Sequence, residues 1–422
     1  MTNARPASHP FYVLALLFVV LVFSVVDRYI LAILVDDIKV DLQISDTAMG
    51  FVMGMAFSVV NAVAGIPLAR LADQRSRTAI VAIGIGAWSI LTTAQGFVRT
   101  FAALALARMG VGIGEATTGP AAHSLLSDYF PPERRATAIA VYTMGGHVGV
   151  VLGFAGGGLL NDALGWRMTM VAVGLPGLLI AGVVMATLRE PVRGLSEARR
   201  ADGEQIPFGE VFRYLYSQRT FRHMAAVLPL LVFTNYAISF WGPAFLMRVH
   251  EMTASEVGVA LGLVQGIGGA LGGVIGAWAC DRLGRRDRRW YLWLPAVAAL
   301  GSLPFLLGFV WLPDPWLAIY CVGPAVFLIS VHIAPVYALG QGLARLRMRA
   351  MASALLHLGA SILAAGVGPQ LIGLTNDLLE PRFGEEAVRY SLMLVAFSTL
   401  LGVFHAWRAS RTLLGDLEAA RD

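Results

Sequence analysis

Charged residues are scarce in this chain of 422 residues, because Asp, Glu, Lys and Arg together make up only 14% of it. Soluble domains carry about 25% charged residues. Lysine is almost absent, with Lys39 as its single representative. Hydrophobic residues reach 57%, and the mean hydropathy is +0.68. The composition therefore excludes a soluble domain and indicates helices that span a membrane.

The sequence also has little of what catalysis or metal binding needs. It has two cysteines, Cys280 and Cys321, both in apolar segments and without the spacing of a disulfide framework or a metal site. It contains no Walker motif, Ser-His-Asp signature or His-Glu-x-x-His signature. The glycine run at 110–114 lies inside an apolar helix with no strand before it, which argues against a nucleotide site. We therefore expect no enzyme activity, no cofactor and no metal.

Apolar runs separated by charged, Pro or Gly positions predict twelve transmembrane helices. The polar interval 189–220 divides them into two sets of six. We expect an all-α membrane protein with an N-terminal six-helix bundle in residues 1–188, a cytoplasmic linker in 189–220 and a C-terminal six-helix bundle in 221–422. The predicted helices are 11–35, 47–72, 78–98, 101–128, 136–160, 168–188, 221–248, 255–280, 289–310, 315–343, 350–376 and 387–408.

The distribution of basic residues predicts the orientation. With the N-terminus inside, twenty-four of the 32 basic residues fall at inner ends or inner loops. Such an excess of Arg and Lys marks the cytoplasmic side. Because these residues are scattered over short loops, we expect no nucleic-acid partner. The first apolar run is long, and no small-residue cleavage site follows it, so it is interpreted as a retained span. We expect a multi-pass protein of a cell membrane, namely a bacterial inner membrane, with both termini cytoplasmic.

Two patterns repeat between the halves. Gly65-x₃-Ala69-x₃-Asp73-x₃-Arg77 returns as Gly273-x₃-Ala277-x₃-Asp281-x₃-Arg285, and Arg135-Ala136-x-Ala138 returns as Arg349-Ala350-x-Ala352. Both shifts are close to half the chain length, which indicates a parallel duplication. Transporters built in this way bind substrate between the repeats, near the middle of the membrane.

These motifs resemble the major facilitator superfamily over essentially the whole chain. The run Asp281-Arg282-Leu283-Gly284-Arg285-Arg286 is close to the loop motif of that family, and the copy at 69–77 is degenerate. The resemblance implies two rocking bundles and a cytoplasmic gate that holds them together when the protein opens outward. Candidate gate residues are Asp73, Arg77, Arg135, Asp281 and Arg349. The alternative is that these charges serve topology alone.

Within the superfamily, three segments look like the spinster-type branch: Val26-Asp27-Arg28-Tyr29, Arg108-x₆-Glu115, and the run 128–135. This resemblance implies an amphipathic, lipid-like substrate such as a lysolipid or a sphingoid phosphate. The helix at 136–160 carries the glycines of the antiporter subgroup. Phe154 stands where that subgroup commonly has proline, which weakens an antiporter interpretation.

Four charges lie inside apolar segments of the first half. A charge at mid-bilayer depth costs about 2.5–3.5 kcal/mol on insertion scales, so such residues usually serve function. Arg108 and Glu115 are two helical turns apart on one face, and Asp27 is nearly level with Arg108. We expect Asp27 or Glu115 to neutralise Arg108 in the empty protein, with Asp27 and Glu115 as proton-coupling sites and Arg28 and Arg108 as substrate contacts. The alternative is a static buried network that only sets helix packing.

The second half lacks such charges, since Ala237 and Ile238 stand where the repeat would place Asp27 and Arg28. The sequence instead predicts an apolar and aromatic wall for the tail of a substrate. Ordinary bundle packing is the alternative for these side chains. The candidate substrate contacts outside the charged cluster are His147, Asn235, Tyr236, Phe240 and Trp241.

The leading hypothesis is a proton-coupled secondary transporter of an amphipathic, lipid-like molecule, working by alternating access. Two alternatives remain open: a multidrug or organic-ion antiporter, and a passive lipid facilitator in which the charges serve binding only. A receptor without transport activity is disfavoured by the internal repeats. We expect the protein to act as a monomer whose partners are the substrate, protons and membrane lipids.

Overall fold

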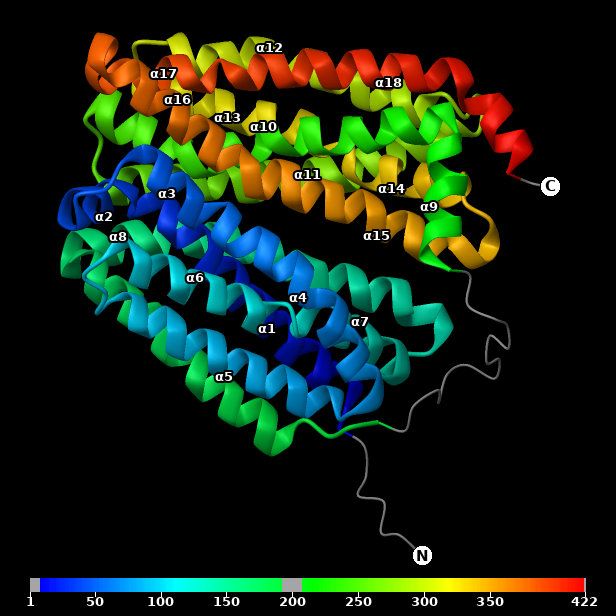
Figure 1. Cartoon of the computed structure of the whole chain (residues 1–422), viewed down its shortest axis with the longest axis horizontal. Helices are drawn as coiled ribbons and strands as arrows, with labels where there is room; N and C mark the ends of the chain where they lie inside the picture. Colours follow the sequence, from blue (N-terminus) through cyan, green and yellow to red (C-terminus); the bar gives the residue numbers. More distant parts are fainter. Residues whose placement is uncertain (1–7, 192–206, 421–422) are drawn as a thin grey trace, which may run out of the picture.

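The computed structural model describes residues 8–191 and 207–420, and Figure 1 shows two helical bundles lying side by side. The N-terminal bundle holds the first eight helices and the C-terminal bundle holds the remaining ones. In chain order the N-terminal helices are α1 (Pro10–Ile33), α2 (Val35–Leu42), α3 (Asp46–Met53), α4 (Met55–Gln74), α5 (Arg77–Gln95), α6 (Phe101–Glu115), α7 (Thr118–Tyr129) and α8 (Pro132–Thr187). The C-terminal elements are α9 (Phe208–Ser217), α10 (Arg219–His250), α11 (Ala254–Gly284), α12 (Trp290–Trp311), α13 (Pro315–Ser330), α14 (Ile333–Gly342), η1 (Leu346–Met348), α15 (Arg349–Gly359), η2 (Ala360–Val367), α16 (Gly368–Phe383), η3 (Gly384–Glu386), α17 (Ala387–Leu392) and α18 (Leu394–Ala419).

The described residues contain nine candidate membrane spans by length and hydropathy, and these cover eleven of the twelve predicted helices. Two of the spans, Pro132–Thr187 and Arg349–Ala419, each contain two predicted helices. The predicted helix 101–128 is not among these spans, because it is divided into two shorter helices: α6 ends at Glu115 and α7 begins at Thr118. Within α8 the chain reverses at Gly165, whose φ of 74° suits glycine. The twelve-helix prediction is therefore confirmed.

Several predicted helices are broken where another element approaches closely. The predicted helix 47–72 is divided at Gly54 into α3 and α4. A Cβ on Gly54 would lie 2.3 Å from the backbone oxygen of Gly366 in η2. Only glycine permits this approach between the two halves. The η2 segment is a π-helical stretch within the predicted helix 350–376, a type of irregularity that is frequent at functional sites.

Two helices were not predicted. α2 lies in the loop after the first span, and α9 lies inside the interval 189–220 that we predicted as a linker. In Figure 1, α9 runs across the ends of the membrane-spanning helices. Val211 and Leu215 on α9 are buried in the core of the C-terminal half. The linker interval is therefore partly a packed helix.

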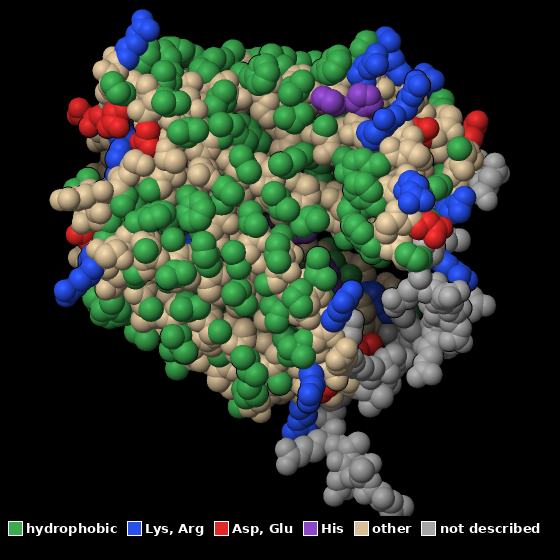
Figure 2. All heavy atoms as spheres, in the orientation of Figure 1, with side chains coloured by type: hydrophobic (Ala, Val, Ile, Leu, Met, Phe, Trp, Pro, Cys, Tyr) green, Lys and Arg blue, Asp and Glu red, His purple; other side chains and the backbone are tan. Residues whose placement is uncertain are grey.

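The halves meet along α8 and α11. A Cβ on Gly258 would lie 2.2 Å from the Phe154 oxygen, and one on Gly266 would lie 2.4 Å from the Val151 side chain. Small residues allow helices to approach this closely in membranes. We call the end of the bundles that carries α2 and Gly165 the outer end, following the predicted orientation. Figure 2 shows a hollow between the halves on the side away from that end.

The orientation can be tested by cysteine labelling in a variant whose two native cysteines are replaced by serine. Val40 on α2 is 76% exposed at the outer end, and Arg286 is exposed at the opposite end. We expect a membrane-impermeant maleimide to label Val40→Cys in whole cells and to label Arg286→Cys only after the cells are opened. The reverse pattern would contradict the predicted orientation.

Candidate functional site

Asp27 on α1 and Arg108 on α6 form a buried ion pair. Arg108 Nη1 lies 2.7 Å from Asp27 Oδ2, and the Thr92 hydroxyl donates to Asp27 Oδ1 at 2.5 Å. Arg108 is 0% exposed and Asp27 is 2% exposed. The expectation that a carboxylate neutralises Arg108 is confirmed, and Asp27 is the partner.

Glu115 pairs with Arg28, the charge whose partner the sequence did not specify. Arg28 Nη2 lies 2.9 Å from Glu115 Oε2, and the Ser24 hydroxyl donates to the same oxygen at 2.7 Å. The side chain of Arg28 is 27% exposed and that of Glu115 only 2%. Successive residues of a helix point about 100° apart, so Asp27 and Arg28 reach different partners on α6. Arg28 is therefore the cluster's accessible cation.

Both arginines also lie against one aromatic ring. The guanidinium carbons of Arg28 and Arg108 are 4.7 Å and 5.1 Å from the centre of the Phe57 ring on α4. Such cation–π contacts stabilise a desolvated cation. Glu115 Oε1 is buried and has no hydrogen-bond partner within the described residues. The cluster thus keeps an unused acceptor beside its accessible arginine.

Aromatic side chains from both halves pack together beside Arg28. The rings of Tyr29 and Tyr236 are each nearly parallel to that of Phe240, with ring centres 5.8 Å and 5.6 Å away. Tyr29 belongs to α1, whereas the other two rings belong to α10, so the stack bridges the halves. Arg28 is close enough to Tyr236 and to His357 on α15 for electrostatic interaction. Phe240 is only 1% exposed, so the partly exposed rings near Arg28 are those of Tyr29 and Tyr236.

The other predicted contacts occupy different surroundings. Asn235 accepts a long hydrogen bond of 3.4 Å from Ser239. Trp241 is 0% exposed and donates to the Pro369 oxygen at 2.8 Å, so in this conformation it packs α10 against α16. His147 faces α11, where a Cβ on Gly269 would lie 3.3 Å from its ring.

His357 is a polar group on the C-terminal side of the site. It is exposed, and its two ring nitrogens lie 3.3 Å from the Tyr337 hydroxyl and 3.4 Å from the Ser361 hydroxyl. Its position on an expected cavity helix was visible in the sequence. Its proximity to Arg28 needed the tertiary structure, because the two residues come from different halves.

The outer end is closed by charges from both halves. Arg248, at the end of α10, binds Asp36 and Asp46 of the N-terminal half, with closest distances of 2.5 Å and 2.6 Å. Lys39 also contacts Asp46 at 3.0 Å. Burial raises the pKa of Asp36, although Arg248 opposes that shift. The network joins the first loop to the C-terminal bundle.

Two helix caps reinforce this closure reciprocally. Asp377 on α16 accepts hydrogen bonds from the Asp46 and Thr47 amides in the first turn of α3, at 3.0 Å and 2.8 Å. Asp162 on α8 accepts from the Ser255 amide in the first turn of α11 at 2.9 Å. Carboxylates stabilise helix N-termini through the unpaired amides and the helix dipole. Each half therefore caps a helix of the other half.

The residues that form these caps belong to a third repeat in the sequence. Residues 158–162 read Gly-Leu-Leu-Asn-Asp, and residues 373–377 read Gly-Leu-Thr-Asn-Asp. A Cβ on Gly158 or on Gly373 would lie 2.2 Å from the backbone oxygen of Ala254 or Asp46, respectively. The two closures are thus pseudo-symmetric copies. We call the contacts of Asp162, Asp377 and Arg248 across the halves the outer latch.

The comparisons with known proteins agree with this architecture. The family described as Major Facilitator Superfamily matches residues 17–369. An MFS-type efflux pump of Mycolicibacterium smegmatis is 36% identical over 399 residues, covering 94% of this chain and 92% of the pump. The chain belongs to the major facilitator superfamily.

Other relatives of this superfamily member are spinster proteins. Protein spinster homolog 1 of Bos taurus is 27% identical over 439 residues, covering 94% of this chain and 80% of the relative. A solved bacterial homolog of the human lysosomal transporter spinster, in an inward-facing and unoccupied conformation, has a TM-score of 0.88 and 26% identity, covering 98% of this chain and 99% of that chain. The occupied inward-facing form has a TM-score of 0.84 at the same identity and coverage. The resemblance to the spinster branch is therefore confirmed, and the protein is a transporter rather than an enzyme.

The predicted cytoplasmic gate remains a prediction for this transporter. Arg77 lies 2.5 Å from Asp128 and 2.7 Å from Glu190, all in the N-terminal half. Burial alone would raise the pKa of Glu190, but hydrogen bonds from the Thr78 amide and Arg77 outweigh it and lower that pKa. Arg135 donates to the Ser127 oxygen, and Asp281 accepts from the Tyr291 hydroxyl, in each case within one half. Arg349 is exposed. The side chain of Asp73 is not among those that the structure describes.

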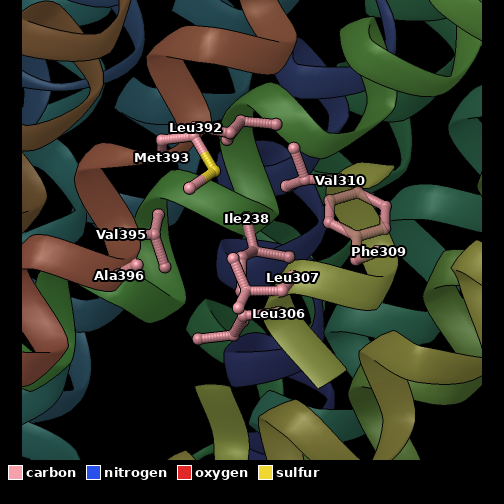
Figure 3. A pocket seen from close by; sticks show the side chains of 9 residues that line it. All are labelled: Ile238, Leu306, Leu307, Phe309, Val310, Leu392, Met393, Val395 and Ala396. Atoms are coloured by element: carbon pink, nitrogen blue, oxygen red, sulfur yellow. The ribbon is translucent and has the colours of Figure 1, made fainter. Parts of the chain in front are cut away.

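A small pocket in the C-terminal half is apolar throughout. Figure 3 shows it between α10, α12 and the helices α17 and α18. It holds no charged or hydrogen-bonding side chain that could orient a substrate, so we do not assign substrate binding to it. Its lining residues are Ile238, Leu306, Leu307, Phe309, Val310, Leu392, Met393, Val395 and Ala396.

The outer latch can be tested by removing both caps. Asp162→Ala with Asp377→Ala should favour outward opening, because each lost cap costs about 0.5–2 kcal/mol in the closed form. Spin labels at Val40→Cys and Leu378→Cys, in a variant without native cysteines, would report the distance across the outer end. We expect a new, longer distance population.

Asp314→Ala is the matched control, because Asp314 caps α13 within one half through the Leu317 amide at 2.8 Å. The control should leave the distance distribution unchanged. An equal change in the control and in the double variant would contradict the assignment.

Proposed function

We propose that this protein is a proton-coupled secondary transporter of an amphipathic, lipid-like anion. The observation that carries the proposal is the position of Arg28. Its guanidinium is paired with the buried Glu115, is partly accessible, and faces Tyr236 across the boundary of the halves. A guanidinium binds carboxylates and phosphates alike through paired donors, so an anionic headgroup could replace Glu115.

The shape of the wall supports an amphipathic substrate rather than a sugar. Beside Arg28 lie the partly exposed rings of Tyr29 and Tyr236, which carry two hydroxyl groups and pack against the buried Phe240. Aromatic rings provide a large contact area for apolar chains. The headgroup would lie at Arg28, and the tail would extend along these rings. The similarity to spinster proteins points in the same direction.

Glu115 is the proposed proton-coupling residue. When an anionic headgroup binds Arg28 in place of Glu115, the buried Glu115 loses its ion pair and keeps only Ser24 as a hydrogen-bond donor. An unpaired buried carboxylate is costly, and protonation removes that cost. Proton and anionic headgroup would then bind together. Asp27 is a weaker candidate for proton coupling, because its carboxylate is paired with Arg108 and accepts a hydrogen bond from Thr92, and it is not paired with the accessible Arg28.

A second candidate, an organic-cation antiporter, is favoured by the relative named as an efflux pump. In that case a cationic group would bind Glu115 directly, and substrate and proton would compete for one carboxylate. The two mechanisms move protons in opposite directions relative to the substrate. Proteoliposomes with an internal pH indicator would distinguish them when offered a lysolipid phosphate or a lipophilic cation. Transport of the lysolipid phosphate without proton movement would support the passive facilitator.

The two arginines should respond differently to substitution. Arg28→Ala should lower transport of the anionic amphiphile at least tenfold while the protein stays folded, because the arginine is partly exposed. Arg108→Ala should reduce the folded yield, since it leaves Asp27 buried without its cation at a cost of about 3–5 kcal/mol. Transport assays and thermal unfolding in detergent would separate the effects.

Asp27→Asn combined with Arg108→Gln removes both charges and should recover part of the folded yield. If Arg28→Ala transported normally while Arg108→Ala folded but lost substrate binding, the roles assigned here would be reversed.

Glu115→Gln should abolish acceleration of transport by a pH gradient while leaving substrate exchange measurable, because glutamine can still accept from Ser24 but cannot titrate. Glu385→Gln, a change at an exposed outer residue, is the control. Uptake into proteoliposomes at several imposed pH gradients is the measurement. An unchanged dependence on the gradient in Glu115→Gln would exclude Glu115 as the coupling residue.

A further inference from the structure

Two histidines form a direct contact on the surface of the C-terminal half. His223 on α10 and His405 on α18 place their Nδ1 atoms 3.0 Å apart, with ring centres separated by 5.1 Å. Both side chains are half-buried. They lie toward the inner ends of their helices and outside the central space between the halves. Neither the proposed transport mechanism nor the outer latch uses them.

Basic and aromatic side chains surround this pair. Arg222 and Arg408 are exposed and lie close enough to His223 for electrostatic repulsion. Arg411 lies 3.7 Å over the ring of Trp407, which is 45% exposed. Figure 2 shows histidine side chains beside a group of basic ones at this end of the C-terminal half. Exposed tryptophan and arginine at helix ends are typical of the membrane interface.

Arg222 and Arg408, together with the two histidines, form a positive patch that has no acidic partner among the described residues. Arg219 is exposed in the first turn of α10, beside the patch. Asp416 of α18 faces α10, where its carboxylate accepts a hydrogen bond from the Thr220 amide at 2.8 Å. Thr220 and Thr412 bond each other at 2.8 Å between the two helices. Among the described residues, no salt bridge neutralises Arg222 or Arg408.

We propose that His223, His405, Arg222 and Arg408 bind the phosphate of an anionic phospholipid from the inner leaflet, and that this binding strengthens as the pH falls. Basic pockets between transmembrane helices on the cytoplasmic side suit anionic headgroups. The location at the membrane interface, with Trp407 beside it, favours a lipid over a soluble anion. This inference does not depend on the identity of the transported substrate.

The chemistry of the pair supplies the pH dependence. Two neutral imidazoles can share one N–H···N hydrogen bond, with one ring donating and the other accepting. Once both rings are protonated, both nitrogens are donors and repel each other. A phosphate between the helices then accepts from both rings and offsets their charge together with the arginines. The lipid-bound form therefore takes up protons, which is why acid strengthens binding.

The test uses the full-length protein, purified in a neutral detergent and titrated with phosphatidylglycerol or phosphatidylcholine at pH of about 5.5 and about 8, on either side of the histidine range. Native mass spectrometry would count the bound lipids. We expect phosphatidylglycerol to bind several-fold more tightly at the lower pH, with no such change for phosphatidylcholine. A phosphatidylglycerol affinity that does not depend on pH would overturn the proposal.

Variants assign the effect to the patch. Arg222→Gln with Arg408→Gln should weaken phosphatidylglycerol binding, by about fivefold for each arginine. His223→Asn with His405→Asn should keep binding but abolish its pH dependence. Arg285→Gln with Arg286→Gln, which removes two exposed arginines directly after the inner end of α11, is the matched control. Thermal unfolding would check that each variant is folded.

An equal loss of binding in the control would overturn the proposal, because it would indicate a general attraction of the basic surface. Retained pH dependence in the histidine double variant would also overturn it. Inorganic phosphate added at millimolar concentration should not displace the lipid. Its displacement of the lipid would indicate a soluble-anion site instead.

Discussion

The cost of placing charge inside the membrane governs the centre of this protein. Four ionised side chains lie at depth in the N-terminal bundle, and each is tolerable only when it is paired. Asp27 with Arg108 and Arg28 with Glu115 meet that condition, and Phe57 covers both cations. These contacts fix α1, α4 and α6 relative to one another.

The two pairs differ in access to water, and that difference separates structure from function. The pair of Asp27 and Arg108 is sealed and has an additional donor in Thr92, so it serves best as a fixed anchor. The pair of Arg28 and Glu115 has one accessible member and one buried member with an unused oxygen. The second pair is therefore the more accessible of the two.

The outer latch has a different physical character, because it combines close backbone approach with modest electrostatic contacts. Gly158 and Gly373 let the halves touch, and Asp162 and Asp377 cap helices across the boundary. Each cap contributes little free energy, which suits a closure that has to break in every transport cycle. Its pseudo-symmetry follows from the duplication of the chain, which gives each half one cap on the other.

The sequence by itself determined the class of the protein, its twelve helices and the four membrane charges, because hydropathy, duplicated motifs and intramembrane charges are local features. It placed Asp27 level with Arg108 from helix direction alone. Only the tertiary structure decided that Glu115 binds Arg28, that Trp241 packs against Pro369, and that His357 faces Arg28. The tertiary structure also showed that the aspartates of the repeated Asn-Asp at 161–162 and 376–377 cap helices of the opposite half. These contacts depend on how helices distant in the sequence rotate and pack, and no local pattern encodes that rotation.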